Sequence, residues 1–228
     1  MTRSSVARCW RALASIESHY GARPMPFRVR MAAPWALLVL LGLLAGISRT
    51  AEAQTTVTRR VAASSDDAEE EGPTGTTPNR MWLVSTDIEL VSDFEPNTAG
   101  VQKIGLRFTN MAIPVGATIT DAYLIFRAIP ADPGMTNSDP TSLTIRGELA
   151  ANPSTFTTTS GNISSRALTT ASASWVPTSW TTGQDYSSPS IVSVVQELVD
   201  QGAWASGNAM AIVINRNFYF VLFNYKFN

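Results

Sequence analysis

The chain has 228 residues, of which 44% are hydrophobic and 15% are charged, as is typical of a globular rather than a disordered protein. This length accommodates one domain of ordinary size and additional segments. Residues 1–53 contain the only cysteine and the only histidine, Cys9 and His19, whereas residues 54–228 carry a net charge of −6. Without these residue types, residues 54–228 offer no disulfide, no Cys/His zinc site and no Ser-His-Asp triad, and their acidity argues against a nucleic-acid partner.

A leader is predicted from an uncharged apolar segment, residues 36–47, which follows several arginines. The segment is shorter than the about 20 residues that a membrane-spanning helix needs, so it is typical of a signal peptide. Residues 51–53, Ala-Glu-Ala, place small side chains where signal peptidase prefers them, which predicts cleavage before Gln54. We therefore interpret residues 1–53 as the leader of a secreted, extracellular protein. Residues 1–24 are open to interpretation as an over-called gene start, and an uncleaved N-terminal anchor is the alternative to cleavage.

Alternation of apolar and polar residues predicts a series of short β-strands. The clearest lies at residues 119–128, where Ala122, Leu124 and Phe126 share the face that we expect to be buried. Many short strands, Gly/Pro turns and one helix predict an all-β, jelly-roll-like antiparallel β-sandwich over residues 54–216. The other predicted strands lie at residues 56–62, 81–84, 87–91, 103–108, 142–148 and 209–214.

The one predicted helix follows a long polar segment. Residues 154–190 include nineteen Ser and Thr, but embedded aromatic and aliphatic residues indicate a connection that is pinned to a core rather than disordered. We expect the helix to begin with Ser188 as its N-cap and Pro189 as its first residue, and to end before Gly202.

Residues 217–228 form an atypical aromatic tail. The tail is rich in Phe, Tyr and Asn, lacks a polar face of period two, and uses residue types with A/T-rich codons. Two interpretations are open. The tail is either translated non-coding sequence that replaces the true C-terminal strand, or a genuine buried final strand.

One block of sequence carries a family resemblance. It reads Gly-Leu-Arg-Phe at residues 105–108, Ile-Pro-Val-Gly-Ala-Thr-Ile at residues 113–119 and Ala-Tyr-Leu at residues 122–124. The block resembles the DNRLRE-type β-sandwich modules of secreted bacterial and extracellular proteins, although the run that names the family is absent. The resemblance extends over roughly residues 80–214 and implies a jelly-roll sandwich. It also implies a place beside enzymes or in surface proteins, and some relatives bind polysaccharides such as alginate.

Two acidic segments of similar sequence form the candidate metal site. Ser-Asp-Asp-Ala-Glu at residues 65–69 and Ser-Thr-Asp-Ile-Glu at residues 85–89 both place Asp and Glu two residues apart, on one face of an extended chain. Brought together, the four carboxylates would repel each other unless a Ca²⁺ ion held them. The alternative is two solvated acidic faces that pair with Arg107 and Arg127. The four candidate ligands are Asp67, Glu69, Asp87 and Glu89.

Three tryptophans, Trp82, Trp175 and Trp180, are the candidate ligand-binding residues. An indole has an apolar face and an edge that can stay hydrated, so an exposed tryptophan can stack on a sugar ring. Trp180 has the most polar sequence surroundings and is the better candidate. The alternative is packing in the core, which is the usual place for tryptophan.

These observations favour a secreted, non-catalytic module that binds an extracellular polysaccharide. Two alternatives stay open. One is a structural or adhesive module whose partners are surface proteins, and the other is part of a carbohydrate-active enzyme. The sequence contains no phosphate loop and no dinucleotide-binding fingerprint, but its carboxylate pairs leave glycoside hydrolysis open by residue type alone.

Overall fold

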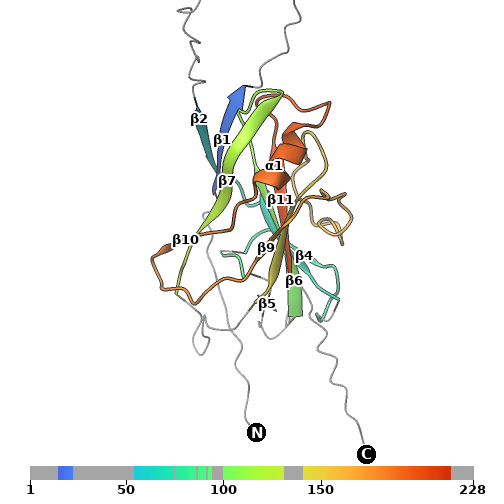
Figure 1. Ribbon diagram of the computed structural model, residues 1–228. Helices are drawn as coiled ribbons and strands as arrows, with labels where there is room; N and C mark the ends of the chain where they lie inside the picture. Colours follow the sequence, from blue (N-terminus) through green and yellow to red (C-terminus); the bar gives the residue numbers. More distant parts are fainter. Residues whose placement is uncertain are drawn as a thin grey trace, which may run out of the picture.

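The chain folds as an all-β sandwich in the computed structural model, with one short helix among the residues that the structure describes (Figure 1). The apolar leader segment, the predicted cleavage site and the aromatic tail lie outside the described residues. Of residues 15–22, 92–93 and 100, the structure describes the backbone alone. The described residues are 15–22, 54–73, 75–85, 87–90, 92–93, 100–130 and 141–216.

The smaller sheet has four strands, and each neighbouring pair is antiparallel. Its longest strand, β7, covers the strand predicted at residues 119–128. Its third strand in spatial order, β1, belongs to the predicted leader, where the sequence analysis expects no strand. In spatial order the strands are β10 (Asp185–Ser187), β7 (Ala117–Arg127), β1 (Ser15–Ala22) and β2 (Thr55–Arg60).

The larger sheet has seven strands and is also antiparallel throughout. Of the strand predicted at residues 87–91, the structure describes residues 87–90, which are irregular apart from one isolated bridge at Ile88. The path through this sheet is β4 (Met81–Trp82), β3 (Asp67–Glu71), β6 (Gly100–Phe108), β11 (Met210–Arg216), β8 (Leu143–Gly147) and β9 (Ala173–Trp175), and β5 (Ser92–Asp93) pairs with β6.

The main core lies between the two sheets. Leu106 and Phe108 of β6 and Leu124 and Phe126 of β7 are all fully buried in one cluster. The two residues named in each strand are two positions apart because successive side chains of a strand point to opposite sides of the sheet. Burial of each such side chain contributes about 1.5–3 kcal/mol to folding.

The helix α1 (Val192–Val199) packs against β7 and β8, and its buried residues Val194, Val195, Leu198 and Val199 belong to the main core. It begins later than the sequence predicts. The N-cap residue is Ile191, without a side-chain cap. Ser188 is not a cap because its hydroxyl accepts the Leu124 N–H at 3.0 Å and donates to the Pro189 carbonyl at 2.8 Å. A tertiary contact with β7 therefore overrides the local capping signal.

A second, smaller core covers the outer face of the larger sheet. The ring of Phe156 lies directly against Gly105 of β6, where an added Cβ would come within 2.5 Å of the ring. Only glycine leaves room for this contact. The members of the smaller core are Ala68, Met81, Phe156, Ile163, Ala211 and Val213.

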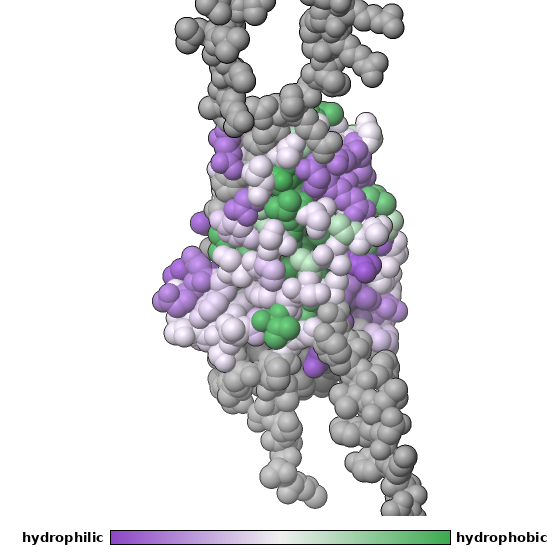
Figure 2. Space-filling model, viewed as in Figure 1, coloured by the Kyte–Doolittle hydropathy of each residue, from purple (hydrophilic) through white to green (hydrophobic). Residues whose placement is uncertain are grey.

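The surface is mainly polar on the side drawn in Figure 2, where apolar residues gather in a strip near α1. In the part of the chain that the structure describes, no helix has the length and apolar character to cross a membrane.

Candidate functional site

The strand β3 is almost wholly acidic, and its register determines which carboxylates share a face. Asp67 pairs with Leu106 of β6 and Glu69 pairs with Ile104, two residues of the main core. Ala68 of β3 instead belongs to the smaller core on the outer face. Because side chains alternate along a strand, Asp67 and Glu69 lie together on the inner side of the sheet.

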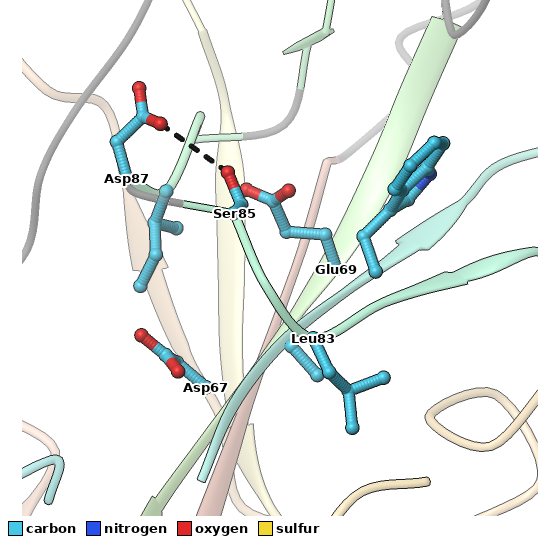
Figure 3. A pocket seen from close by; sticks show the side chains of 8 residues that line it. Asp67, Glu69, Leu83, Ser85 and Asp87 are labelled. Carbon is cyan, nitrogen blue, oxygen red and sulfur yellow. Dashed lines mark hydrogen bonds between the residues drawn. The ribbon is translucent and has the colours of Figure 1, made fainter. Parts of the chain in front are cut away.

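A small hollow lies beside this inner side of β3 (Figure 3). Asp67, Glu69, Trp82, Ser85 and Asp87 contribute to its lining. Its volume is about 10 Å³, which is close to the smallest volume that holds one water molecule. The hollow therefore has room for one water molecule, one hydroxyl group or one ion.

Hydrogen bonds hold the second acidic segment against β3. The Ser85 hydroxyl donates to Asp87 Oδ1 at 3.3 Å, and the backbone N–H of Glu89 donates to Glu69 Oε1 at 3.1 Å. In Figure 3 the carboxyl groups of Glu69 and Asp87 both lie toward Ser85, and Asp67 lies apart from them. Ser85 is a polar group of the site that the candidate ligands did not include, although it is the first residue of the second acidic segment.

Three of the four candidate calcium ligands thus line one hollow, and Glu89 does not. The Glu89 carboxylate accepts a hydrogen bond from Gln102 Nε2 at 3.2 Å, and the same amide nitrogen donates to the Glu89 carbonyl at 3.1 Å. Within the described ranges, no three Asp, Glu, His or Cys side chains stand where they could jointly hold a metal ion.

Burial raises the pKa of Asp67 above its ordinary value of 3.8. A backbone hydrogen bond lowers this pKa, and the negative charge of the adjacent Asp66 raises it further. The anionic form of Asp67 is therefore disfavoured where it stands. A cation or a hydrogen-bond donor in the hollow would stabilise it.

The two arginines considered as partners of the acidic segments have different neighbours. Arg107 pairs with Asp66 at 2.5 Å, and Asp66 is 5% exposed, so this ion pair is largely buried. Arg127 pairs with Asp185 of β10 at 3.0 Å on the surface. The first acidic segment is therefore not a solvated face, because two of its three carboxylates, those of Asp66 and Glu69, are buried and bound by partners.

Among the described side chains, the most buried carboxylate is that of Glu70, which the sequence analysis did not single out. It accepts the backbone N–H groups of Ile163 and Ser164 at 2.7 Å each and the Lys103 ammonium at 3.0 Å. Burial alone would raise the pKa of Glu70, but the hydrogen bonds from Ser164 and the ion pair with Lys103 bring it below its ordinary value of 4.5. Glu70 anchors a loop, and its partners are too far along the sequence to be recognised there.

Trp175 and Trp180 are core residues in this structure, each 6% exposed. The Trp175 ring stacks on Phe126 at 5.3 Å between centroids, and the Trp180 ring stacks on Tyr186 at 4.7 Å. Both indoles thus have aromatic neighbours where a sugar would have to stack. For Trp175 and Trp180 the structure therefore agrees with the alternative of packing in the core.

Trp82 is partly buried and lines the hollow. The guanidinium of Arg80 lies 3.8 Å from its ring centroid, a cation–π contact that covers one face of the indole. The indole N–H is buried and makes no hydrogen bond. Of the three candidate tryptophans, Trp82 alone adjoins the carboxylates.

No family model, curated protein or solved structure matches the chain. The chemistry of the hollow is therefore the guide to function. Its carboxylates accept hydrogen bonds or bind a cation, and its hydroxyl, that of Ser85, is bound by a carboxylate rather than by a base of the imidazole type.

Proposed function

We propose that residues 54–216 form a non-catalytic module of a secreted protein, and that the hollow beside β3 binds hydroxyl groups of an extracellular polysaccharide. One observation supports this proposal. Three acidic residues, Asp67, Glu69 and Asp87, line the same hollow as Ser85 and Trp82. Carboxylates accept hydrogen bonds from sugar hydroxyls, and an indole offers an apolar surface to the C–H groups of a sugar ring.

The size and charge of the hollow determine the kind of ligand. A space for one water-sized group admits one sugar hydroxyl or one ion, so we expect a shallow, weak site that contacts the edge of a sugar. Three carboxylates repel a carboxylated polysaccharide such as alginate unless a cation lies between them. We therefore propose that neutral polysaccharides bind without metal. Ca²⁺ prefers carboxylate oxygens, and we propose that it extends binding to carboxylated polysaccharides, whose own carboxylates add to the fewer than three that the described part of the protein places around one point.

Affinity electrophoresis of the exported protein tests this proposal. Gels that contain a neutral β-glucan should retard the protein in EDTA, whereas gels that contain alginate should retard it only in millimolar Ca²⁺. Asp87→Asn and Ser85→Ala should reduce both effects. Asp185→Asn is the matched control, because it removes the same charge from an exposed ion pair on β10.

The same experiment separates the alternatives. If no polysaccharide retards the protein with or without Ca²⁺, the glycan proposal fails and a structural or adhesive module becomes the better account. Release of reducing ends from any of the polysaccharides would instead identify a carbohydrate-active enzyme. N-terminal sequencing of the exported protein tests the secretion step, for which we expect a chain that begins at Gln54.

A further inference from the structure

The strand β1 lies inside the smaller sheet, although it precedes the predicted cleavage site. It pairs with β7 at eight positions on one side and with β2 at six positions on the other. Among the described strands, β2 has no other partner, and β7 has only the short β10, paired at three positions, on its other side. Removal of residues 1–53 would leave one edge of β7 and the whole of β2 without a neighbour.

The space between β7 and β2, here called the slot, cannot stay empty at low cost. Ala122 and Leu124 of β7 are fully buried in the main core, and Val57 of β2 is 5% exposed. An empty slot would expose this part of the core and a row of unpaired backbone groups on β7, which pair with any available strand. The exported chain therefore needs a strand that replaces β1.

The topology shows where a replacement strand can come from. The end of β6 at Phe108 and the start of β7 at Ala117 lie at one end of the sandwich, and β11 starts there too, because Met210 pairs with Phe108. Both β7 and β11 run away from this end and finish at the opposite one. In Figure 1, β11 runs down toward the end at which β1 begins. A chain that leaves Arg216 and turns back enters the slot antiparallel to β7, as β1 does.

We propose that residues 217–228 fill the slot in the exported chain, and that β1 holds the same place until the leader is removed. Sheets that pack face to face are about 10 Å apart, a distance that about three or four extended residues span at roughly 3.3 Å each. Of the twelve residues in 217–228, about eight then remain, and β1 has eight. The tail is rich in Phe and Tyr, which favour strands, and contains no proline. This proposal rests on the proposed removal of the leader and does not depend on the polysaccharide site.

The first test deletes residues 217–228 in two contexts. The full chain, produced without export, keeps β1, whereas the exported chain that begins at Gln54 does not. We expect the deletion to lower the Tm of the exported chain by ~10 °C or more, or to abolish soluble protein, and to change the Tm of the leader-containing chain by less than ~2 °C. An equal effect of the deletion in both contexts overturns the proposal.

Hydrogen exchange locates the replacement strand. Leu124 directs its backbone toward β10, since its N–H donates to the Ser188 hydroxyl at 3.0 Å and its carbonyl accepts the Ser188 N–H at 2.8 Å. Neighbouring residues of a strand direct their backbone groups to opposite sides, so the N–H groups of Tyr123 and Ile125 face the slot. We expect all three amides to exchange slowly in the exported chain of residues 54–228. Fast exchange of Tyr123 and Ile125 beside a protected Leu124 overturns the proposal, as does failure of this chain to fold.

A peptide experiment covers the case in which the chain of residues 54–216 does not fold alone. This chain is refolded with a synthetic peptide of residues 217–228, and the matched control is the same peptide with Val221→Pro, which cannot donate its backbone hydrogen bond. Recovery of soluble protein with the first peptide but not with the control supports the proposal. Recovery with a peptide of residues 15–22 alone would mean that the slot accepts strands but not this tail, and the proposal fails.

Discussion

The two parts of the long Ser/Thr-rich connection are held to the sandwich by different forces. The 154–170 loop lies on the outer face of the larger sheet and is held mainly by buried charges. The 175–187 loop joins β9 of one sheet to β10 of the other and is held mainly by stacked aromatic rings. Both are polar in sequence. Composition therefore does not decide how a loop of this kind is fixed.

Arg166 shows how charge fixes the first loop. All five N–H bonds of its guanidinium find acceptors: one is Glu148 Oε2 at 2.5 Å, and the other four are oxygens of the loop itself. The guanidinium also lies 4.2 Å from the ring centroid of Phe156, which in turn covers Gly105. A polar loop can pack tightly on a sheet when one buried cation satisfies several of its carbonyls.

Trp180 shows how rings fix the second loop. Its ring lies 5.9 Å from that of Trp175 and 4.7 Å from that of Tyr186. The Tyr186 hydroxyl accepts the backbone N–H of Thr181 at 2.7 Å, so the stack also satisfies the loop backbone. The ion pair between Arg127 and Asp185 in this region is half exposed and contributes little. The first loop should respond to pH, and the second should not.

The largest expected effect is that of Trp180→Ala. Removal of a buried indole leaves a cavity among three rings, and we expect the free energy of unfolding in urea to fall by about 3–5 kcal/mol. Val176→Ala is the control, because Val176 is 63% exposed in the same loop. A loss below about 1 kcal/mol for Trp180→Ala would contradict the aromatic anchoring of this loop.

Glu70→Ala should follow closely, with a loss of about 3 kcal/mol in the same measurement. The substitution leaves the Lys103 ammonium and the N–H groups of Ile163 and Ser164 without their buried acceptor. Glu70→Gln keeps an oxygen acceptor and should lose less. If the alanine and glutamine variants are equally stable and match the wild type, charge does not hold the 154–170 loop.

Acid should lower the stability of the protein through protonation of Glu70. The pKa of Glu70 is lowered in the folded protein, so its charged form contributes stability that is complete above pH 4.5 and is lost as the pH falls through the lowered value. The Tm of the wild type should therefore fall on acidification below about pH 4.5, and Glu70→Gln should flatten this part of the curve. Trp180→Ala should keep the full dependence of Tm on pH. A weaker dependence in that variant would contradict the idea that charge holds the first loop and aromatic rings hold the second.

The smallest expected effect lies at the hollow. The pKa of Asp67 is raised, so its anion costs stability above that pKa, and the cost disappears as the pH falls through it. Asp67→Asn should accordingly raise the Tm at pH 7 by roughly 2 °C. Millimolar Ca²⁺ should raise the Tm of the wild type but not of this variant, by mass action on the folded state. Asp185→Asn should keep the Ca²⁺ response, and a wild type indifferent to Ca²⁺ leaves the site without its proposed metal.

The strands of the main core were predictable from sequence, and the acidic strand was not. In β7, one face is buried and the other is not, so the alternation of Ala122, Leu124 and Phe126 is visible in the sequence. In β3, residues on both faces are buried and most are carboxylates, which have low strand propensity. What stabilises β3 is a set of partners such as Lys103 and the 154–170 loop, and no local pattern encodes them. The residues of β1 precede the predicted cleavage site, so the sequence assigned them to the leader rather than to a strand.

The candidate site was predictable only in part. The two-residue spacing of Asp67 and Glu69 predicts a shared face, and the repeated motif brings Asp87 to the same hollow. Glu89 departs from the pattern because Gln102 binds its carboxylate, a contact that depends on the register of β6. Trp180 has polar neighbours in sequence, and its burial is decided by rings that the fold brings to it from other strands.

The long sequence separation between Glu70 and its loop partners has a consequence for the order of folding. The N–H groups that bind this carboxylate come from residues 93 and 94 positions later in the chain. Contacts of such separation form late, and the carboxylate keeps its hydration until the loop arrives. Substitutions in the 154–170 loop should therefore accelerate unfolding more than they slow refolding. The loop would detach before the sheets separate, so a protease should cut the native protein first in this loop while the sandwich stays closed.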